Sequence, residues 1–496
     1  MRKSGILMHI TSLPNPYGIG TVGKCAYDFV DFLVEAGQSY WQILPLNPTG
    51  YGDSPYQSVS SFAGNHYMID LDVLIQEGLL KQEEVDSFTW GESETRVDYG
   101  CLYNNRMKML HLAYIRFTPD QAFQDFVEEN QDWLPDYAMF MTLKERYPGM
   151  DWQGWPEDLK LREPERMAAV RQELSYPIGF QYFLQYKFFQ QWTALRAYAA
   201  EKGIRIIGDV PIYVPLDSAD LWANPQLFQL DDACRPTAVA GCPPDSFTAD
   251  GQLWGNPLYD WDKMKKTDYA WWVRRLRAAS RMYDVIRLDH FRGFESYWAV
   301  PAGDKTAAGG SWQKGPGMDF VGAIQSALPE LDFIAEDLGY MTPEVKQLLA
   351  DSGYPGMKVL QFAFDSRDTG SARDYLPHNY TENAVVYTGT HDNDTTIGWF
   401  EAISDDDWNL AREYLCDFYT PDEEMDRPFV ALAMQSIARM CIIPMQDYLG
   451  LGTEARMNTP STIGCNWRWR MTEDQFTEDL CRDILAQTRR YGRTET

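Results

Sequence analysis

The sequence lacks paired cysteines and long apolar runs. Its eight cysteines are scattered, with no Cys-x-x-Cys pair, which argues against a zinc site and against a disulfide framework. No run approaches the ~20 apolar residues that a membrane-spanning helix needs. The apolar stretch at residues 6–8, after the basic start of the chain, is too short for the core of a signal peptide. These absences predict a protein of a reducing, cytoplasmic compartment, with no metal site and no membrane partner.

Positive charge is also scarce. Lys and Arg number 44 against 72 Asp and Glu, so the formal net charge is -28. A surface of this charge repels nucleic acid and anionic lipid, which excludes both as partners. Aromatic residues, by contrast, are plentiful, with 17 Trp and 29 Tyr. Most must serve the core, but rings with an apolar face and a polar edge also suit the faces of sugars.

Short apolar runs alternate with helical stretches along the chain. Amphipathic periodicity predicts helices at residues 26–36, 180–202 and 269–283, each followed by a strand. We expect strands at residues 4–10, 39–46, 204–214, 284–288, 331–339, 357–364, 384–394 and 441–447. Eight strands joined by helical segments are typical of an α/β protein with a closed (β/α)8 TIM barrel. The alternative is an open doubly wound sheet. A glycine-rich phosphate loop is expected in such a sheet, and the sequence does not contain one.

Two long segments interrupt this alternation. Residues 51–178 read as mostly helical, whereas residues 215–268 are rich in Pro, Gly and Asp, contain no good strand and are expected to bind substrate. After the last strand only about 50 residues remain, too few for an appended β-sandwich. They end in a helix-like stretch at residues 473–491. We therefore expect residues 1–496 to form a single catalytic barrel with two insertions.

Acidic side chains follow several of the predicted strands. Asp209, Asp289, Glu336 and Asp392 each stand at the exit of a different strand. In a (β/α)8 barrel these exits meet at one end, where active sites lie. If the four residues only formed separate structural ion pairs, their shared position at strand exits would be a coincidence. The chain offers no histidine cluster for a metal, no serine nucleophile elbow and no phosphate loop. Carboxylates alone favour the cleavage of a glycosidic bond, which needs one acid and one ionised carboxylate.

The neighbours of these carboxylates suggest their roles. Asp289 lies between Arg287 and Arg292, whose positive charge is expected to hold it ionised as a nucleophile. Glu336 follows an apolar run and precedes Asp337, so it is expected to keep its proton as the general acid and base. Asp392 can grip sugar hydroxyls, and Asp337 can serve as a strand-end anchor that points away.

Seven motifs, in order, resemble those of glycoside hydrolase family 77, the 4-α-glucanotransferases also called amylomaltases or disproportionating enzymes. They occupy residues 52–57 (GDSPYQ), 208–213 (GDVPIY), 252–257 (QLWGNP), 287–293 (RLDHFRG), 335–339 (AEDLG), 354–357 (YPGM) and 390–394 (THDND). Two departures stand beside them. Ser246 replaces a frequent aromatic residue, and residues 460–462 read Pro-Ser-Thr in place of the more usual Pro-Gly-Thr.

The resemblance implies an enzyme that transfers α-1,4-glucan segments between maltooligosaccharides with no obligatory cofactor. It implies a retaining mechanism with a β-glucosyl intermediate on Asp289, with Glu336 as acid and then base, and with Asp392 on the 2- and 3-hydroxyls. It also makes Tyr56 the ring that stacks on the same sugar. The expected substrate-binding residues are Ser54, Tyr56, Asp209, Asp245, Phe247, Trp254, Asn256, Arg287, His290, His391 and Asn458.

Two other functions remain open at this point. An α-glucan hydrolase of the α-amylase type would use the same intermediate, with water in place of the acceptor sugar. A glucan-binding protein with a dead site is disfavoured by the intact Asp289, Glu336 and Asp392. His9 and His66 are expected to be structural, and the sequence leaves the oligomeric state open.

Overall fold

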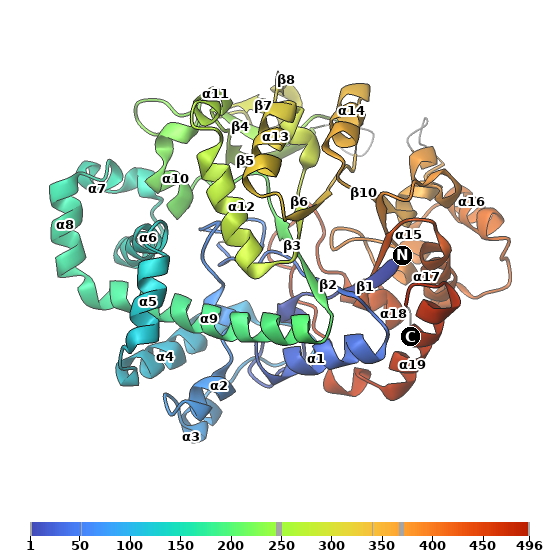
Figure 1. Ribbon diagram of the computed structural model, residues 1–496, viewed down its shortest axis with the longest axis horizontal. Helices are drawn as coiled ribbons and strands as arrows, with labels where there is room; N and C mark the ends of the chain where they lie inside the picture. The colour runs from blue at the N-terminus through green and yellow to red at the C-terminus, as the bar shows by residue number, and fades with distance from the viewer. Residues whose placement is uncertain (1, 51, 245–249, 340, 367–371, 495–496) are drawn as a thin grey trace.

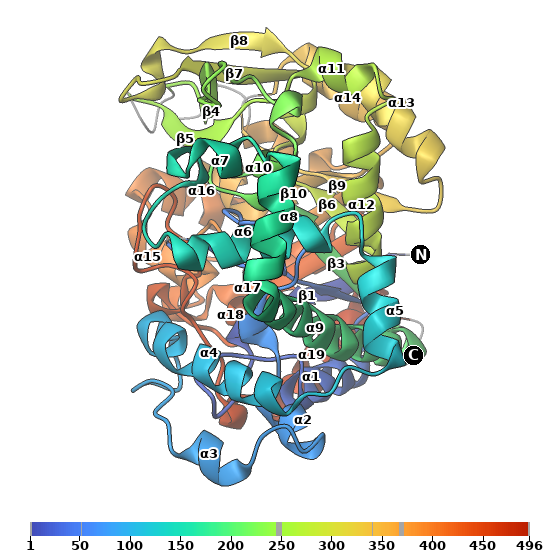
Figure 2. The same cartoon turned by 90° about the vertical axis from the view of Figure 1, so that its left-hand side faces the viewer.

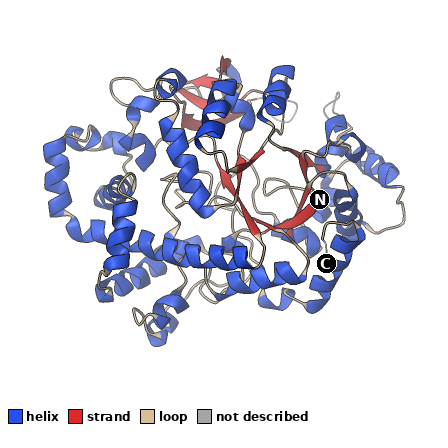
Figure 3. Cartoon of the chain, viewed as in Figure 1, coloured by secondary structure: helices blue, strands red, loops and turns tan. Residues whose placement is uncertain are grey.

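Eight parallel strands close into a barrel at the centre of the molecule (Figure 1, Figure 3). The computed structural model describes residues 2–50, 52–244, 250–339, 341–366 and 372–494. The barrel order is β1-β12-β11-β10-β9-β6-β3-β2, and the first and last strands pair directly, with Lys3 opposite Met440. The predicted (β/α)8 barrel is confirmed. Its strands are β1 (Lys3–Leu7), β2 (Tyr40–Gln42), β3 (Arg205–Val210), β6 (Val285–Leu288), β9 (Asp332–Ala335), β10 (Gly356–Val359), β11 (Ala384–Tyr387) and β12 (Met440–Pro444).

Helices cover much of the outside of this barrel (Figure 1). α1 buries Phe29, Val30 and Leu33, which recur at helical spacing and face the core. The helix α14 begins at the side-chain cap of Thr342 and ends at Gly353, whose φ of 70° suits glycine. Outside the segment between β2 and β3, the helices are α1 (Lys24–Glu35), α10 (Ala219–Ala223), α11 (Trp261–Lys265), α12 (Ala270–Met282), α13 (Gly317–Ala327), α14 (Pro343–Ser352), α15 (Thr396–Ala402), α16 (Asp405–Leu415), α17 (Asp426–Gln435), α18 (Met445–Tyr448) and α19 (Glu478–Arg490).

Between β2 and β3 the chain leaves the barrel and forms a group of helices. Figure 2 faces this group, which ends in the long helix α9 that returns to the barrel. The aromatic side chains of α9, such as Phe183, Phe188 and Trp192, are buried in the core and so serve packing, as the sequence predicts. The helices of this segment are α2 (Leu71–Gln76), α3 (Gln82–Asp86), α4 (Tyr99–Arg116), α5 (Gln121–Glu129), α6 (Leu134–Arg146), α7 (Glu157–Lys160), α8 (Pro164–Glu173) and α9 (Ser175–Glu201).

A second, antiparallel sheet lies at the top of Figure 2, and the sequence analysis missed it. Its order is β5-β4-β7-β8. The prediction that residues 215–268 contain no strand is therefore wrong, because two of these strands lie there. Both are short and contain glycine, and β4 lies between β5 and β7, which follows much later in the chain, so local patterning does not reveal the sheet. The strands are β4 (Ala238–Cys242), β5 (Gln252–Pro257), β7 (Ser296–Pro301) and β8 (Ser311–Lys314).

The chain shows no candidate for a membrane span among the residues that the structure describes. None of the helices there combines the length and the apolar character that crossing a bilayer requires.

Candidate active site

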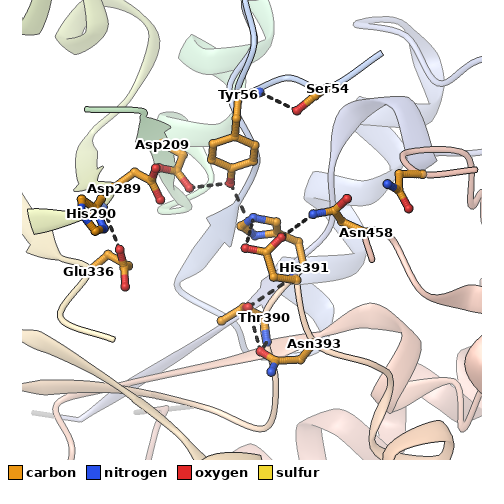
Figure 4. A network of polar contacts seen from close by, with 12 residues as sticks. Ser54, Tyr56, Asp209, Asp289, His290, Glu336, Thr390, His391, Asn393 and Asn458 are labelled. Atoms are coloured by element: carbon orange, nitrogen blue, oxygen red, sulfur yellow. Dashed lines mark hydrogen bonds and ion pairs between the residues drawn. The ribbon is translucent and has the colours of Figure 1, made fainter. Parts of the chain in front are cut away.

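The loops that follow the barrel strands bring the predicted polar residues together (Figure 4). Asp209 lies on β3 and Arg287 on β6, and Asp289 follows the end of β6. Glu336 comes directly after β9, and the ring of Tyr56 enters from the loop after β2. The predicted convergence at strand exits therefore occurs.

Arg287 is the cation at the centre of this cluster. Its Nη1 donates to Asp209 Oδ2 at 2.6 Å and to Asp289 Oδ1 at 2.9 Å. The Arg287 side chain is 4 % exposed, and the facing carboxylates raise its pKa well above the usual value despite its burial. Arg287 thus remains charged at every relevant pH. One positive charge is shared by two carboxylates, which fixes both relative to β6.

Asp289 differs from the sequence-based expectation. Arg287 lowers the pKa of its carboxyl, as predicted, but burial is the larger effect, and Asp209 and Glu336 add negative charge; the pKa rises to about 8. The second predicted partner, Arg292, instead places its guanidinium 4.0 Å from the centre of the Trp312 ring and donates to Ser296. Asp289 is therefore held less firmly ionised than the flanking arginines suggest. Its side chain is 28 % exposed, so the carboxyl can meet a ligand.

Glu336 is held by backbone groups. Its Oε2 accepts the N–H of His290 at 2.7 Å, and its Oε1 accepts the N–H of Leu338 at 2.8 Å. The backbone of His290 adopts a φ of 50°, which is uncommon for a non-glycine residue and turns this N–H toward Glu336. Burial is the largest effect on Glu336 and raises its pKa, the direction expected of a general acid.

An aromatic wall stands beside these carboxylates. The rings of Tyr56 and His391 are stacked, and the Tyr56 hydroxyl donates to Asp209 Oδ2 at 2.8 Å (Figure 4). The indole of Trp467 lies beside both rings, with centroid distances of 5.8 Å to Tyr56 and 6.0 Å to His391. Burial lowers the pKa of His391, so the imidazole is neutral near pH 7. The wall is thus uncharged and anchored to the carboxylate cluster.

Asp392 is the most exposed of the predicted carboxylates that the structure describes. Its side chain is 48 % exposed, with Oδ2 3.4 Å from His391 Nε2. Asn458 donates to the other oxygen, Oδ1, at 2.6 Å, and Arg456 donates to the backbone carbonyl at 2.9 Å. The carboxylate is therefore oriented yet accessible to a hydroxyl group.

Other predicted residues take supporting places. Trp254, on β5, meets the imidazole of His290 edge-on at 4.8 Å. Asn256 is buried and donates to the carbonyl of Val214, while Ser54 Oγ accepts the backbone N–H of Tyr56. Asn256 therefore ties β5 to the segment after β3, and Ser54 shapes the turn that presents Tyr56. The predicted substrate contacts Asp245 and Phe247 lie outside the described residues, as does Ser246.

Three further expectations concern buried residues. Burial lowers the pKa of His9 to about 3 and that of His66 to about 4, so both stay neutral. His9 accepts the backbone N–H of Leu44 at 3.3 Å, a structural contact. Asp337 accepts the backbone N–H of Met357 at 2.6 Å and so anchors β10, as expected.

Sequence reasoning missed three neighbours of the site. Trp467 and Arg456 come from the segment after β12, where Asn458 is the one residue predicted to bind substrate. Met357 belongs to a recognised motif, yet its sulfur accepts the Arg287 Nε–H at 3.3 Å, a contact that no local pattern predicts.

The chain is similar to known proteins over nearly its whole length. The profile of glycoside hydrolase family 77, described as 4-alpha-glucanotransferase, matches residues 8–476. The 4-alpha-glucanotransferase of Clostridium butyricum is 47 % identical over 492 residues, covering 98 % of this chain and 100 % of the relative. That of Streptococcus pneumoniae is 48 % identical over 499 residues, covering 99 % and 97 %.

A solved structure agrees with these sequence relatives. The amylomaltase from Streptococcus agalactiae, in complex with acarbose, superposes with a TM-score of 0.96 at 42 % identity, and each chain is covered fully. Since both the profile and the relatives extend over nearly the whole length, the chain belongs to the 4-alpha-glucanotransferases of glycoside hydrolase family 77.

Proposed function

We propose that the enzyme transfers α-1,4-glucan segments between maltooligosaccharides by a retaining double displacement on Asp289. The observation that carries this proposal is the arrangement of two unlike carboxyl groups. Asp289 receives a hydrogen bond from the Arg287 cation, whereas Glu336 receives hydrogen bonds from neutral backbone N–H groups. Burial raises the pKa of both carboxyl groups, so their hydrogen bonds distinguish them. A carboxylate bonded to a cation suits the nucleophile, and a carboxyl bonded to neutral N–H groups suits the acid.

In the first step, a carboxylate oxygen of Asp289 bonds to the anomeric carbon while the glycosidic C–O bond breaks. Glu336 gives its proton to the leaving oxygen, and the shortened glucan departs. The hydrogen bond and the charge of Arg287 favour the ionised form of Asp289 before the attack, and the positive charge that develops on the sugar stabilises the carboxylate further in the transition state. In the second step, Glu336 takes the proton of an acceptor hydroxyl, whose oxygen displaces Asp289 with a second inversion.

The surrounding residues provide for binding and orientation. Tyr56 and Trp254 offer aromatic surfaces to the sugar, and Asp392 offers a carboxylate to two hydroxyls. The Streptococcus agalactiae amylomaltase was solved in complex with acarbose, a pseudo-oligosaccharide, which supports a saccharide ligand. The similarity to transferases along the full length disfavours the α-amylase-type hydrolase.

Incubation with pure maltotriose, without added metal, tests transfer directly. We expect longer oligosaccharides and glucose to appear while the total of reducing ends stays constant. A rise in reducing ends without longer products would show hydrolysis and overturn the proposal.

A trapping experiment tests the intermediate. A maltosyl donor with a good leaving group needs no acid, so Glu336→Gln is expected to form the glycosyl-enzyme and then stall. Intact-protein mass spectrometry should record one added maltosyl group. The matched variant Asp289→Ala should record none, and an adduct on that variant would refute Asp289 as the nucleophile.

We further propose that the barrel, the helices between β2 and β3 and the small sheet form one catalytic domain. Thermal unfolding followed by circular dichroism should then show one transition that coincides with the loss of activity. Two separated transitions would show independent domains.

A further inference from the structure

A thioether lies against the cation of the active site. Met357, on β10, is 1 % exposed, and its Sδ accepts the Nε–H of Arg287 at 3.3 Å. The strands β10 and β6 are separated by β9 in the barrel order, so the side chain reaches across the barrel interior. The next residue, Lys358, points the other way and places its ammonium 5.4 Å from the centre of the Tyr375 ring.

The guanidinium is planar, and its N–H donors have fixed directions. Holding Nε therefore orients the whole plane and determines where Nη1 points. In this structure Nη1 donates to both Asp209 and Asp289. Rotation of the plane would weaken at least one of these bonds, because the same nitrogen makes both.

The chemistry of the acceptor matters as well. A thioether sulfur is a weak and uncharged acceptor. It satisfies the buried Nε–H without competing with the two carboxylates for the positive charge of Arg287. Leucine has a similar volume but offers no acceptor, and a carboxylate at this position would take a share of the charge.

The backbone of Met357 is itself held in place by Asp337, the residue next to Glu336. Its backbone N–H donates to Asp337 Oδ1 at 2.6 Å, and Asp337 directly follows Glu336. Gly356 permits this approach, because a Cβ there would lie 2.6 Å from Asp337 Oδ2. A continuous set of contacts thus runs from the residue after Glu336, through Met357 and Arg287, to Asp289.

We propose that Met357 is a positioning residue, which orients the Arg287 guanidinium so that Nη1 reaches Asp209 and Asp289 together. This inference deepens the proposed function, on which its kinetic test rests. It assigns Met357 no contact with the substrate. The groups that face or electrostatically influence the Arg287 cation are Asp209, Asp289, Glu336, Tyr56, His391 and Tyr387.

The kinetic test compares Met357→Leu with Met440→Leu. Met440 is also a buried methionine of a barrel strand, at the start of β12. Met357→Leu should lower kcat for maltotriose by about 10- to 100-fold, the range expected when positioning is lost, with little change in KM. Its acidic limb of kcat/KM should move to higher pH, because Arg287 lowers the pKa of Asp289, the group that must be ionised. Unchanged kcat and pH profile in Met357→Leu would overturn the proposal, as would the same changes in Met440→Leu.

A second test needs neither substrate nor activity. The 20 methionines can be labelled on the methyl carbon, and the Met357 resonance can be assigned by its loss in Met357→Leu. In the substrate-free wild-type protein this resonance should move with pH as the carboxyl groups around Arg287 titrate. The Met440 resonance should not move.

A matched variant covers the case in which the leucine protein does not fold. Asp289→Asn should displace one methionine methyl resonance and reduce its response to pH. Methyl resonances that all ignore both pH and Asp289→Asn would refute the positioning role. Because this readout involves no glucan, it remains decisive even if the transfer reaction proves different.

Discussion

The phenol ring of Tyr56 lies nearly parallel to the imidazole of His391, with 4.9 Å between the ring centroids and 14° between the planes. The two rings come from loops after β2 and β11. The Tyr56 hydroxyl also donates to Asp209, which shares the Arg287 cation with Asp289. The surface proposed to meet the sugar is thereby fixed to the same group as the proposed nucleophile.

Tyr56 should therefore show two separable contributions. Tyr56→Phe keeps the stacked ring but loses the hydrogen bond to Asp209, so we expect a small loss in kcat/KM. Tyr56→Ala also removes the ring, and truncation of an anchoring aromatic costs about 2 kcal/mol or more, equivalent to a ~30-fold increase in KM. Steady-state kinetics with maltotriose measure both. Equal losses in the two variants would contradict a stacking role.

Asn458 should matter through the orientation of Asp392. Asn458→Ala removes the 2.6 Å hydrogen bond and is expected to raise KM. Asn458→Asp should be worse than alanine, because it places a second carboxylate beside the first. Asn104→Asp, on the exposed side of α4, is the control for added charge. If the aspartate variant retains more activity than the alanine variant, the hydrogen bond does not orient Asp392.

Asp289 is expected to lower stability as pH rises. The pKa of Asp289 is raised to about 8 in the folded protein, whereas an unfolded aspartic acid has a pKa near 4. Between these values the unfolded state binds fewer protons, so the free energy of unfolding falls with increasing pH. Asp289→Asn, which cannot ionise, should therefore be more stable than the wild type by ~1–3 kcal/mol at pH 8, with a smaller gain at pH 5.

Thermal melting of both proteins at the two pH values checks this prediction. Asp284→Asn, at the other end of β6, breaks an ion pair with Arg196 and should lower the melting temperature instead. A destabilised Asp289→Asn at pH 8 would show that the ion pair with Arg287 outweighs the cost of burial.

Gly208 should be intolerant of a side chain. A Cβ at this position of β3 would lie 2.1 Å from the ring of Tyr283, whose hydroxyl accepts the backbone N–H of Leu46. Gly208→Ala is expected to cost about 1–3 kcal/mol of stability and to disturb the neighbouring Asp209. Gly322→Ala, on α13 with open space around it, should instead stabilise by up to ~1 kcal/mol. Chemical denaturation compares the two.

The barrel was predictable because its strands are apolar, short and separated by periodic helices. The predicted strands ran too long, however. Residues 384–394 were expected to continue the strand, but β11 ends at Tyr387. The polar residues that follow turn toward the site, where they contact residues from other strands. The local sequence does not predict those contacts.

The residues of the site were predictable, but their ion-pair partners and the direction of the pKa shift of Asp289 were not. Arg287 and Arg292 look equivalent beside Asp289 in the sequence, yet only Arg287 contacts it among the bonds described. The contribution of Asp209 to the raised pKa of Asp289 depends on the neighbouring strand β3. The sulfur of Met357 reaches Arg287 from a third strand, so its role could appear only in three dimensions.

The pairing of β1 with β12 also determines when the barrel can close during synthesis. Lys3 emerges from the ribosome long before its partner Met440, which lies on the last strand of the barrel. Until then β1 has one unpaired edge, a known template for wrong strand pairing. Formation of this seam has a high entropic cost because it closes a very long loop, so it is expected to be a late event in folding. Protection of the β1 edge during synthesis would then guard against wrong strand pairing before the barrel closes.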